Sequence, residues 1–443
     1  MSVAGQVGTA VLTTSFQAGD SRVRNSPHAG SCFWYRLSAS RKEKIMKTRK
    51  RSVRFTSRLK DLRHCMAWGM LSPAMCVLTL GVSAIAQQPT ITTIDAPHAG
   101  AISGWGTEAI AICPAGQIAG FYADYTNAMH AYVRTTDGKI TTFDVPGAQG
   151  QGGAIPFPAV GTTPGTYAVA GDACGMVAGY YTDARNVAHG YLRAVDGTFT
   201  TFDTPHAGKG YLQGTFAGNM SMSGEVIAGD YVDATGMYHG FLRASNGTVT
   251  EFDVPAAAKG PGLGTTTFWA QCVNPAGAVT GVYFDQNGAA HGYVRNPDGT
   301  ITTFDAPGAG TGSGLGTWVW AINPAGTTAG ASQDNNGVYH GLLRTADGKI
   351  TIYDIKGAGT GAGQGTQAEG INPAGVIAGY YTDANNVSHG YVRAVDGTYT
   401  FFDVPAAGTG NGQGTFPMTN NPAGSIVGYY IDNKGAYHGF VRQ

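Results

Sequence analysis

The sequence predicts an all-β fold, a seven-bladed β-propeller built from four-stranded antiparallel blades. One observation is a segment of about 50 residues that recurs seven times, a period typical of repeat architectures. A second is that each copy holds four short runs of β-branched and aromatic residues separated by turn residues, without a helical run. The third is that the incomplete copies at the two ends of the repeat region complement each other.

Two recurring segments set the register of the repeats. One reads His-Gly-aromatic-Val-Arg with small variations, and the other is an aromatic residue followed by Asp. The first begins at His130, His189, His239, His291, His340, His389 and His438. The second ends at Asp144, Asp203, Asp253, Asp305, Asp354 and Asp403. One further copy of the second segment ends at Asp95, so the repeat region begins with a lone last strand.

Each repeat is predicted to be a meander. In the fifth copy the expected strands are 317–322, 327–333, 340–344 and 349–354. Asn323-Pro324-Ala325-Gly326, Asn336-Gly337 and Asp347-Gly348 separate them, and these residues favour tight reversals. Three successive reversals give four antiparallel strands.

The two ends of the repeat region favour a ring over an open stack. A meander of this size cannot bury both of its faces, so the copies must pack on one another. Residues 90–95 supply a lone fourth strand, and the chain ends on three strands finishing at 438–442. In a closed propeller the first strand completes the last blade. We expect a substantial insertion only in the second blade, at 147–165.

The N-terminal part is predicted to be a targeting segment. Up to Ala86 the chain holds 14 Lys and Arg against 3 Asp and Glu. Basic residues precede an apolar run at 66–82, and Ser83-Ala84-Ile85-Ala86 resembles a signal-peptidase site. The prediction is an extension at 1–45 from an over-long start, a Sec-type signal peptide at 46–86 cleaved after Ala86, and a secreted or periplasmic propeller at 87–443.

The composition after cleavage excludes some functions. The mature part is Gly-rich and net acidic, which argues against nucleic-acid binding, and no membrane span is expected to remain. Cys113, Cys174 and Cys272 stay. The first two lie near equivalent turns of neighbouring repeats, so they form either a disulfide or two buried thiols.

The repeats resemble a known group, the HAF-repeat or probable extracellular repeat proteins of bacteria. The resemblance covers residues 90–443 and rests on the His-(Gly or Ala)-aromatic strand, with His130-Ala131-Tyr132 nearest to the name. The Asp-Gly-Thr, Phe-Asp-x-Pro and Asn-Pro-Ala-Gly segments follow in order. The resemblance implies export and a repeat fold without an established activity, so no functional residue is carried over.

The polar residues common to all copies are better explained by structure than by chemistry. Each copy has an Asp before its second hairpin, a His opening the third strand and an Asp closing the fourth, as in Asp334, His340 and Asp354. Such groups can bind metal or transfer protons. Catalysis, however, needs one asymmetric site, whereas polar groups at every sheet edge need fixed partners. The Arg ending the third strand, such as Arg344, is expected to cap the opposite edge or pair with a turn Asp such as Asp137.

Positions that differ between copies are the better site candidates. Those expected near the central opening are Glu108, Tyr167, Phe216, Trp269, Trp318, Gln367 and Phe416, with Trp320 and Glu369 two residues deeper. The aromatics suit stacking on sugars or capture of a peptide, and the alternative is packing between blades. Glu108, Glu369, His98 and His206 are the acid–base candidates, although no pattern shows that they converge.

We therefore expect a secreted, monomeric binding module for an extracellular carbohydrate or protein, and an enzyme is the less favoured reading. One alternative is a polysaccharide hydrolase or lyase with its site at the channel mouth, and another is a structural envelope protein. Clustering of Glu108, Glu369 and a loop histidine would favour the enzyme. No nucleotide loop, nucleophile elbow or Cys/His metal spacing is present, so no cofactor or metal is expected.

Overall fold

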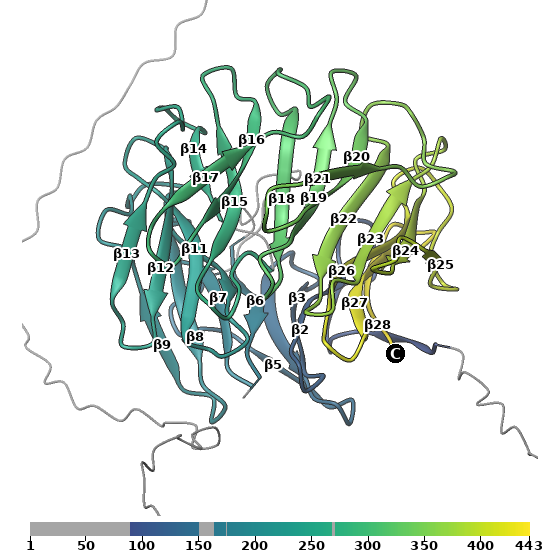
Figure 1. Ribbon diagram of the computed structural model, residues 1–443. Coiled ribbons are helices and arrows are strands. Elements are labelled where there is room, and N and C mark those ends of the chain that lie inside the picture. Colours follow the sequence, from purple (N-terminus) through teal and green to yellow (C-terminus); the bar gives the residue numbers. More distant parts are fainter. Residues whose placement is uncertain (1–88, 150–163, 174, 268–270) are drawn as a thin grey trace, which may run out of the picture. The chain divides into compact units, whose positions relative to one another are not determined.

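The computed structural model describes residues 89–149, 164–173, 175–267 and 271–443, and all regular structure in these ranges is β. The strands follow one another in antiparallel groups of four, and the groups are arranged around a centre, which is the architecture of a β-propeller (Figure 1). The segments predicted as extension and signal peptide, 1–45 and 46–86, lie outside these ranges. Within them, no helix is long and apolar enough to cross a membrane.

Each group of four strands is called a blade here. Its strands occupy four positions, from the innermost strand at the centre to the outermost strand at the rim. The innermost strands are β2 (Thr107–Ile112), β6 (Thr166–Gly171), β10 (Gly214–Met220), β14 (Gly264–Thr266), β18 (Gly316–Ile322), β22 (Gly365–Ile371) and β26 (Gly414–Asn420). The second strands are β3 (Ile118–Ala123), β7 (Val177–Thr182), β11 (Val226–Val232), β15 (Val279–Phe284), β19 (Thr328–Gln333), β23 (Ile377–Thr382) and β27 (Ile426–Ile431). The third strands are β4 (Met129–Arg134), β8 (Ala188–Arg193), β12 (Tyr238–Ala244), β16 (Ala290–Arg295), β20 (Tyr339–Arg344), β24 (Ser388–Arg393) and β28 (Tyr437–Arg442). The outermost strands are β5 (Ile140–Phe143), β9 (Phe199–Phe202), β13 (Val249–Phe252), β17 (Ile301–Phe304), β21 (Ile350–Tyr353), β25 (Tyr399–Phe402) and β1 (Ile91–Ile94).

The core lies between neighbouring blades, where small side chains of one blade pack against large side chains of the next. Ala321 of β18 and Ala329 of β19 are buried in one cluster with Ile371, Ile377 and Tyr391 of the following blade. This is the small-against-large pairing that lets twisted sheets pack to interior density.

A Gly-Thr dipeptide at the start of the innermost strand joins each blade to its neighbour. Gly365 has φ +114°, and a Cβ there would lie 2.0 Å from the carbonyl oxygen of Tyr339 on the third strand of the preceding blade. The next residue, Thr366, is fully buried, and its Oγ1 accepts a hydrogen bond from the backbone N–H of Ile355 at 2.9 Å. The close approach requires glycine. The equivalent glycines are Gly106, Gly165, Gly214, Gly264, Gly316 and Gly414.

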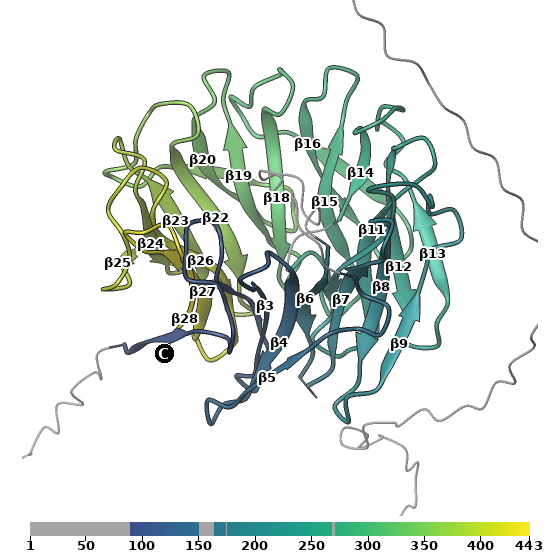
Figure 2. The same ribbon diagram turned by 180° about the vertical axis from the view of Figure 1, so that it is seen from behind.

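The first strand of the repeat region lies beside the last. β1 pairs antiparallel with β28, with Ile91 opposite Arg442 and Ile94 opposite Gly439. Figure 2 shows this strand next to the C-terminal strands. The outermost strand of the β26–β28 blade therefore comes from the N-terminal end of the repeat region, as predicted.

The fourth copy has three extra residues between its first innermost residue and the following turn. Gly264 and Asn274 are ten residues apart, whereas the equivalent Gly316 and Asn323 are seven apart. The extra residues follow β14, a strand of only three residues. Most of the substantial insertion predicted in the second blade, at 147–165, lies outside the described residues.

Candidate functional site at the centre of the propeller

Each blade has two ends, which form two different faces around the central channel. The loop face carries the long loops that lead from an outermost strand to the next innermost strand. The turn face carries the short turns after each innermost strand, such as that beginning at Asn323. The innermost strands therefore run from the loop face to the turn face.

A β-bulge interrupts most innermost strands at an equivalent point. In β22 the register shifts between Ala368 and Gly370, which leaves Glu369 as the extra residue. The extra residues in the other bulged strands are Ile110, Val169, Gly218, Trp320 and Met418. A bulge changes the direction in which the side chain of the extra residue points. The residue type at this position differs from blade to blade.

Four partly exposed aromatic residues pack together near the loop-face ends of β26 and its neighbouring strands. Phe416 of β26 stacks on Tyr429 of β27, with ring centroids 5.0 Å apart and an interplanar angle of 15°. Tyr380 of β23 meets the edge of Phe416 at 5.1 Å, and Tyr437 of β28 lies 5.5 Å from Tyr429. All four side chains keep some solvent exposure. We call the group formed by Phe416, Tyr429, Tyr380 and Tyr437 the aromatic wall.

Two carboxyl groups lie on the strands beside this wall. Glu108 is on β2, and Glu369 is on β22, so the two residues flank β26. Both act electrostatically on Tyr429, whose pKa is raised well above its ordinary value by burial first and by these charges in addition. In the part of the chain that the structure describes, neither carboxyl group forms a hydrogen bond or an ion pair.

Burial alone changes the acidity of both glutamates. Removal from water disfavours the carboxylate, which raises the pKa of Glu108 to about 7 and that of Glu369 to about 8. No charge from a described Lys or Arg side chain offsets this effect. Near neutral pH both groups are therefore able to exchange a proton.

On the other side of the propeller the equivalent aromatic residues are more deeply buried. Tyr167 and Phe216 are only 4% and 7% exposed. Tyr180 lies between them, stacked on Tyr167 at 4.6 Å and tilted against Phe216 at 5.3 Å. These two predicted ligand-binding residues therefore pack between blades, with their ring faces covered.

The predicted tryptophans occupy different environments. Trp320 is 6% exposed, and its carbonyl oxygen accepts a hydrogen bond from the Sγ–H of Cys272 at 3.3 Å. Trp318 keeps partial exposure and meets the edge of Phe284 at 5.9 Å. Trp269 lies outside the described ranges. Of the two described tryptophans, Trp318 is the more exposed.

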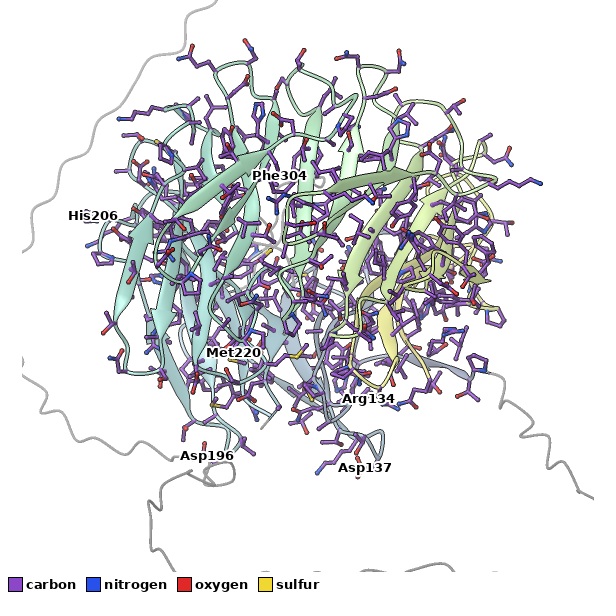
Figure 3. The ribbon with its side chains drawn as sticks, in the orientation of Figure 1. Arg134, Asp137, Asp196, His206, Met220 and Phe304 are labelled. Atoms are coloured by element: carbon purple, nitrogen blue, oxygen red, sulfur yellow. The ribbon has the colours of Figure 1, made fainter. Side chains whose placement is uncertain are left out.

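The loop histidines do not join the glutamates. His206 lies at the outer edge of the molecule (Figure 3), and its Nδ1 is 2.5 Å from Oε2 of Glu251 on an outermost strand. His98 is exposed in the loop after β1. No contact among the described residues brings the acid–base candidates together into one catalytic set, which would need Glu108, Glu369, His98 and His206 to converge.

The polar residues common to every blade make structural contacts. In each blade Nδ1 of the third-strand His lies 2.7–2.9 Å from the Asp after the outermost strand, as in His340 and Asp354. The turn Asp accepts backbone N–H bonds, so that Asp334 Oδ1 accepts from Asn336 and Val338. These contacts fix hairpins and strand ends, as expected.

The arginines that end the third strands also serve the packing. Arg344 lies over the ring of Phe304 in the preceding blade at 4.6 Å, and five further blades repeat this cation–π contact. Asp137 and Asp196 sit at the tips of turns (Figure 3), and neither forms an ion pair with a described Arg side chain. Stacking on the neighbouring blade therefore replaces the Arg–Asp pairing proposed as one option.

The turn face carries a ladder that the sequence did not reveal. Asn274, Asn323, Asn372 and Asn421 each donate a side-chain N–H to the carbonyl oxygen of the equivalent residue in the next blade, at 3.2–3.4 Å. The last of these bonds reaches Cys113 of the β2–β5 blade. Cys113 is a buried free thiol, and Cys174, its partner in the disulfide considered above, lies outside the described residues. The recurring Asn-Pro-Ala-Gly turn was the available signal.

Gln271 of the fourth copy crosses the channel and divides it. Its Nε2 donates to the carbonyl oxygen of Asn420 at 3.2 Å, and its Oε1 accepts from the backbone N–H of Ile371 at 3.0 Å. A small pocket on the turn-face side of this contact is lined by apolar side chains such as Ile322 and Ile371 and by polar ones such as Asn323. The aromatic wall and Glu369 lie on the other side of Gln271, toward the loop face.

A substitution at Glu369 tests whether the pKa of this carboxyl group is raised in the folded protein. A raised folded-state pKa means that the folded protein holds its proton more tightly, so stability falls as pH rises from 4.5 toward about 8. Glu369→Gln cannot ionise. We expect it to match the parent at pH 5 and to be more stable at pH 9 by about 1 kcal/mol or more.

Urea unfolding at the two pH values measures this difference. Glu225→Gln is the matched control, because Glu225 is exposed in a turn. An equal effect of Glu369→Gln at pH 5 and pH 9 would show that its carboxyl group titrates normally.

Comparison with known proteins gives only distant structural similarity. No family model matches the chain, and no curated protein matches it. Puromycin hydrolase is 12% identical with a TM-score of 0.42, over 75% of this chain and 50% of that one. A prolyl endopeptidase is 11% identical with a TM-score of 0.43, over 76% and 50%. The chain thus spans about half the length of these enzymes.

A fucose-binding lectin of Aleuria aurantia, described as a six-bladed β-propeller, is 10% identical with a TM-score of 0.32. The match covers 80% of this chain and 91% of the lectin. Similarity at this level carries no argument about function, so the proposals below rest on the residues of this chain.

Proposed function

We propose that the protein is an exported binding module whose closed, seven-bladed propeller binds a carbohydrate at the loop-face end of its centre. The observation that carries the proposal is the aromatic wall. Phe416, Tyr429, Tyr380 and Tyr437 stay partly exposed, while Tyr167 and Phe216 across the channel are buried. Exposed aromatic rings beside polar groups in a concavity suit stacking on sugar rings.

Three contacts support closure of the ring. β1 pairs with β28, and Gly106 lies against Tyr437 in the same way as Gly365 lies against Tyr339. Asn421 continues the asparagine ladder from the β26–β28 blade to Cys113.

Export is proposed on the sequence alone. The basic stretch, apolar run and Ser83-Ala84-Ile85-Ala86 segment form the pattern of a signal peptide. The resemblance to HAF-repeat proteins implies the same destination. Detection of a processed protein beginning at Gln87 outside the cytoplasm would test this proposal.

An enzyme acting on a polysaccharide is the second candidate function. The pKa values of Glu108 and Glu369, about 7 and about 8, are those of groups that can donate a proton near neutral pH. A glycoside hydrolase would use two such carboxyl groups on opposite sides of one bond. Turnover of any glycan that binds, lost in Glu108→Gln and Glu369→Gln, would establish this activity.

A glycan-array screen of the purified protein tests carbohydrate binding. We expect Phe416→Ala to weaken binding about tenfold or more, because the variant removes the centre of the aromatic wall. Phe401→Ala is the matched control, since Phe401 is 52% exposed on outermost strand β25. Equal loss in both variants, or silence across the array, would favour a structural protein or a protein partner.

A further inference from the structure

Each third-strand histidine lies between two carboxylates at the loop face. In the β2–β5 blade, Nδ1 of His130 is 2.9 Å from Asp144, and its Nε2 is 3.4 Å from Oδ2 of Asp124. The other blades use the Asp six residues before the histidine and the Asp fourteen residues after it, except that His438 has Asp95 of β1 in the second role. Across the seven blades the Nδ1 distances are 2.7–2.9 Å and the Nε2 distances are 3.4–3.9 Å.

Only a protonated ring can donate to both carboxylates. A carboxylate accepts hydrogen bonds and cannot donate one, so the Nδ1 of His130 that faces Asp144 carries a hydrogen. In the neutral ring Nε2 then presents a lone pair to the negative charge of Asp124, which is unfavourable. In the imidazolium both nitrogens donate. One added proton therefore changes the Nε2 contact from repulsion to attraction.

Tyrosines of the second strands favour the same charged form. The ring of His130 stacks on that of Tyr122 with centroids 5.1 Å apart, and six of the seven blades have such a stack, at 4.7–5.1 Å. In the β18–β21 blade Ser332 lies opposite His340 instead. A cation is attracted to the face of an aromatic ring, so these stacks also stabilise the imidazolium.

The turn carboxylates stay charged well below neutral pH. Burial alone would raise the pKa of Asp124, but hydrogen bonds from Ala128 and Thr126 outweigh this effect and hold the pKa below its ordinary value. The pKa of the equivalent turn Asp is lowered in each of the other six blades. A proton that arrives between pH 8 and pH 5 therefore goes to the histidine.

The histidines shift in the opposite direction. The pKa of His130, His189 and His438 is raised, first by the hydrogen bond to the Asp that follows the outermost strand, while burial opposes this effect. The shift and the geometry thus agree in direction.

Two further charged side chains of the described residues contact these clusters. Arg185 pairs with Asp183 at 3.2 Å and competes with the histidine of its blade for that carboxylate. Glu251, which is paired with His206, adds negative charge beside Tyr231, the ring that stacks on His239. The first weakens the preference for a protonated histidine in one blade, and the second strengthens it in the next.

We propose that the seven histidines form an acid-strengthened clamp, in which proton uptake ties the hairpin after each second strand to the start of the long loop that leads to the next blade. The clamp goes beyond carbohydrate binding and does not depend on it. Each cluster is partly exposed, so each contributes little alone. All seven act in the same direction, and His438 additionally holds the end of β1.

The sign of the pH dependence follows from the direction of these shifts. A histidine that is more basic in the folded state stabilises the fold fully below its unfolded pKa of about 6.5, and this contribution is lost as pH rises through the folded-state value. The clamp is therefore strongest near pH 5.5 and weak above about pH 8.

Histidine resonances in NMR spectra of the full chain test the charge contact directly. In Asp124→Asn the amide oxygen can still accept the backbone N–H bonds of Thr126 and Ala128, but the negative charge is gone. We expect the titration midpoint of His130 to fall by about 0.5 pH units or more. Asp137→Asn, in an exposed turn at the other face, should leave it unchanged. An unchanged midpoint in Asp124→Asn would overturn the clamp.

Urea unfolding at pH 5.5 and pH 8.5 tests the effect on stability. In His130→Asn the amide can replace the Nδ1–H donor to Asp144, but it cannot carry charge. We expect the urea midpoint to fall by about 0.3 M or more at pH 5.5 and by less than half as much at pH 8.5. His98→Asn, at an exposed loop histidine, should show no such difference between the two pH values. Equal losses for His130→Asn at both pH values would mean that the ring acts as an uncharged hydrogen-bond partner, which would overturn the proposal.

Discussion

A protein that lacks strand β1 should lose about 4 kcal/mol or more of its free energy of unfolding. Ile94 of this strand is buried in one cluster with Val427 and Val441. Removing the strand uncovers these side chains and leaves the edge of β28 without a partner. Urea unfolding of a chain that begins at Pro97 measures the loss.

The matched control is a chain that begins at residue 89 and keeps the strand. It should unfold at the same urea concentration as the full chain. A synthetic peptide of residues 89–96 should restore part of the lost stability when added to the shorter chain. If the chains beginning at 89 and 97 are equally stable, β1 does not help to close the ring.

Gly365→Ala should destabilise the fold by about 4 kcal/mol or more. The new Cβ would lie 2.0 Å from the carbonyl oxygen of Tyr339, an atom of the backbone that cannot move alone. The glycine also has φ +114°, which side-chain-bearing residues rarely adopt. Two blades would have to separate to admit the methyl group. Denaturant unfolding at constant pH gives the value.

Gly363→Ala is a close control two residues earlier. Gly363 has φ +79° but no atom within 4 Å of the position of its Cβ. The expected cost is therefore about 1–2 kcal/mol, from backbone conformation alone. Similar losses at the two positions would mean that the contact between blades is looser than the structure indicates.

The repeats made most of the fold predictable. Expected strands at 317–322 and 340–344 became β18 and β20 with ends shifted by one residue. Turn residues such as Asn336-Gly337 set these limits locally, so no tertiary information was needed. The position of β1 beside β28 also followed, because a lone strand at one end and three strands at the other complete one sheet.

The site was predictable in part. Glu108, Glu369, Trp318 and Phe416 were expected near the channel and lie there with partial exposure. Tyr167 and Phe216 occupy equivalent positions in other blades, but their rings are covered. The difference arises from neighbours on other strands, such as Tyr180, which sequence position alone does not place.

The sequence by itself determined the repeated meander, the order of its strands and the residue types at each position around the channel. These features depend on side-chain alternation and turn chemistry within about 50 residues of one another. Only the tertiary structure decided which of these side chains stay partly exposed and which are buried. Gln271 crosses the channel to contact Asn420 and Ile371, and Phe416 meets Tyr380 of the preceding blade. Contacts of this kind join separate repeats, so they depend on how the blades pack together.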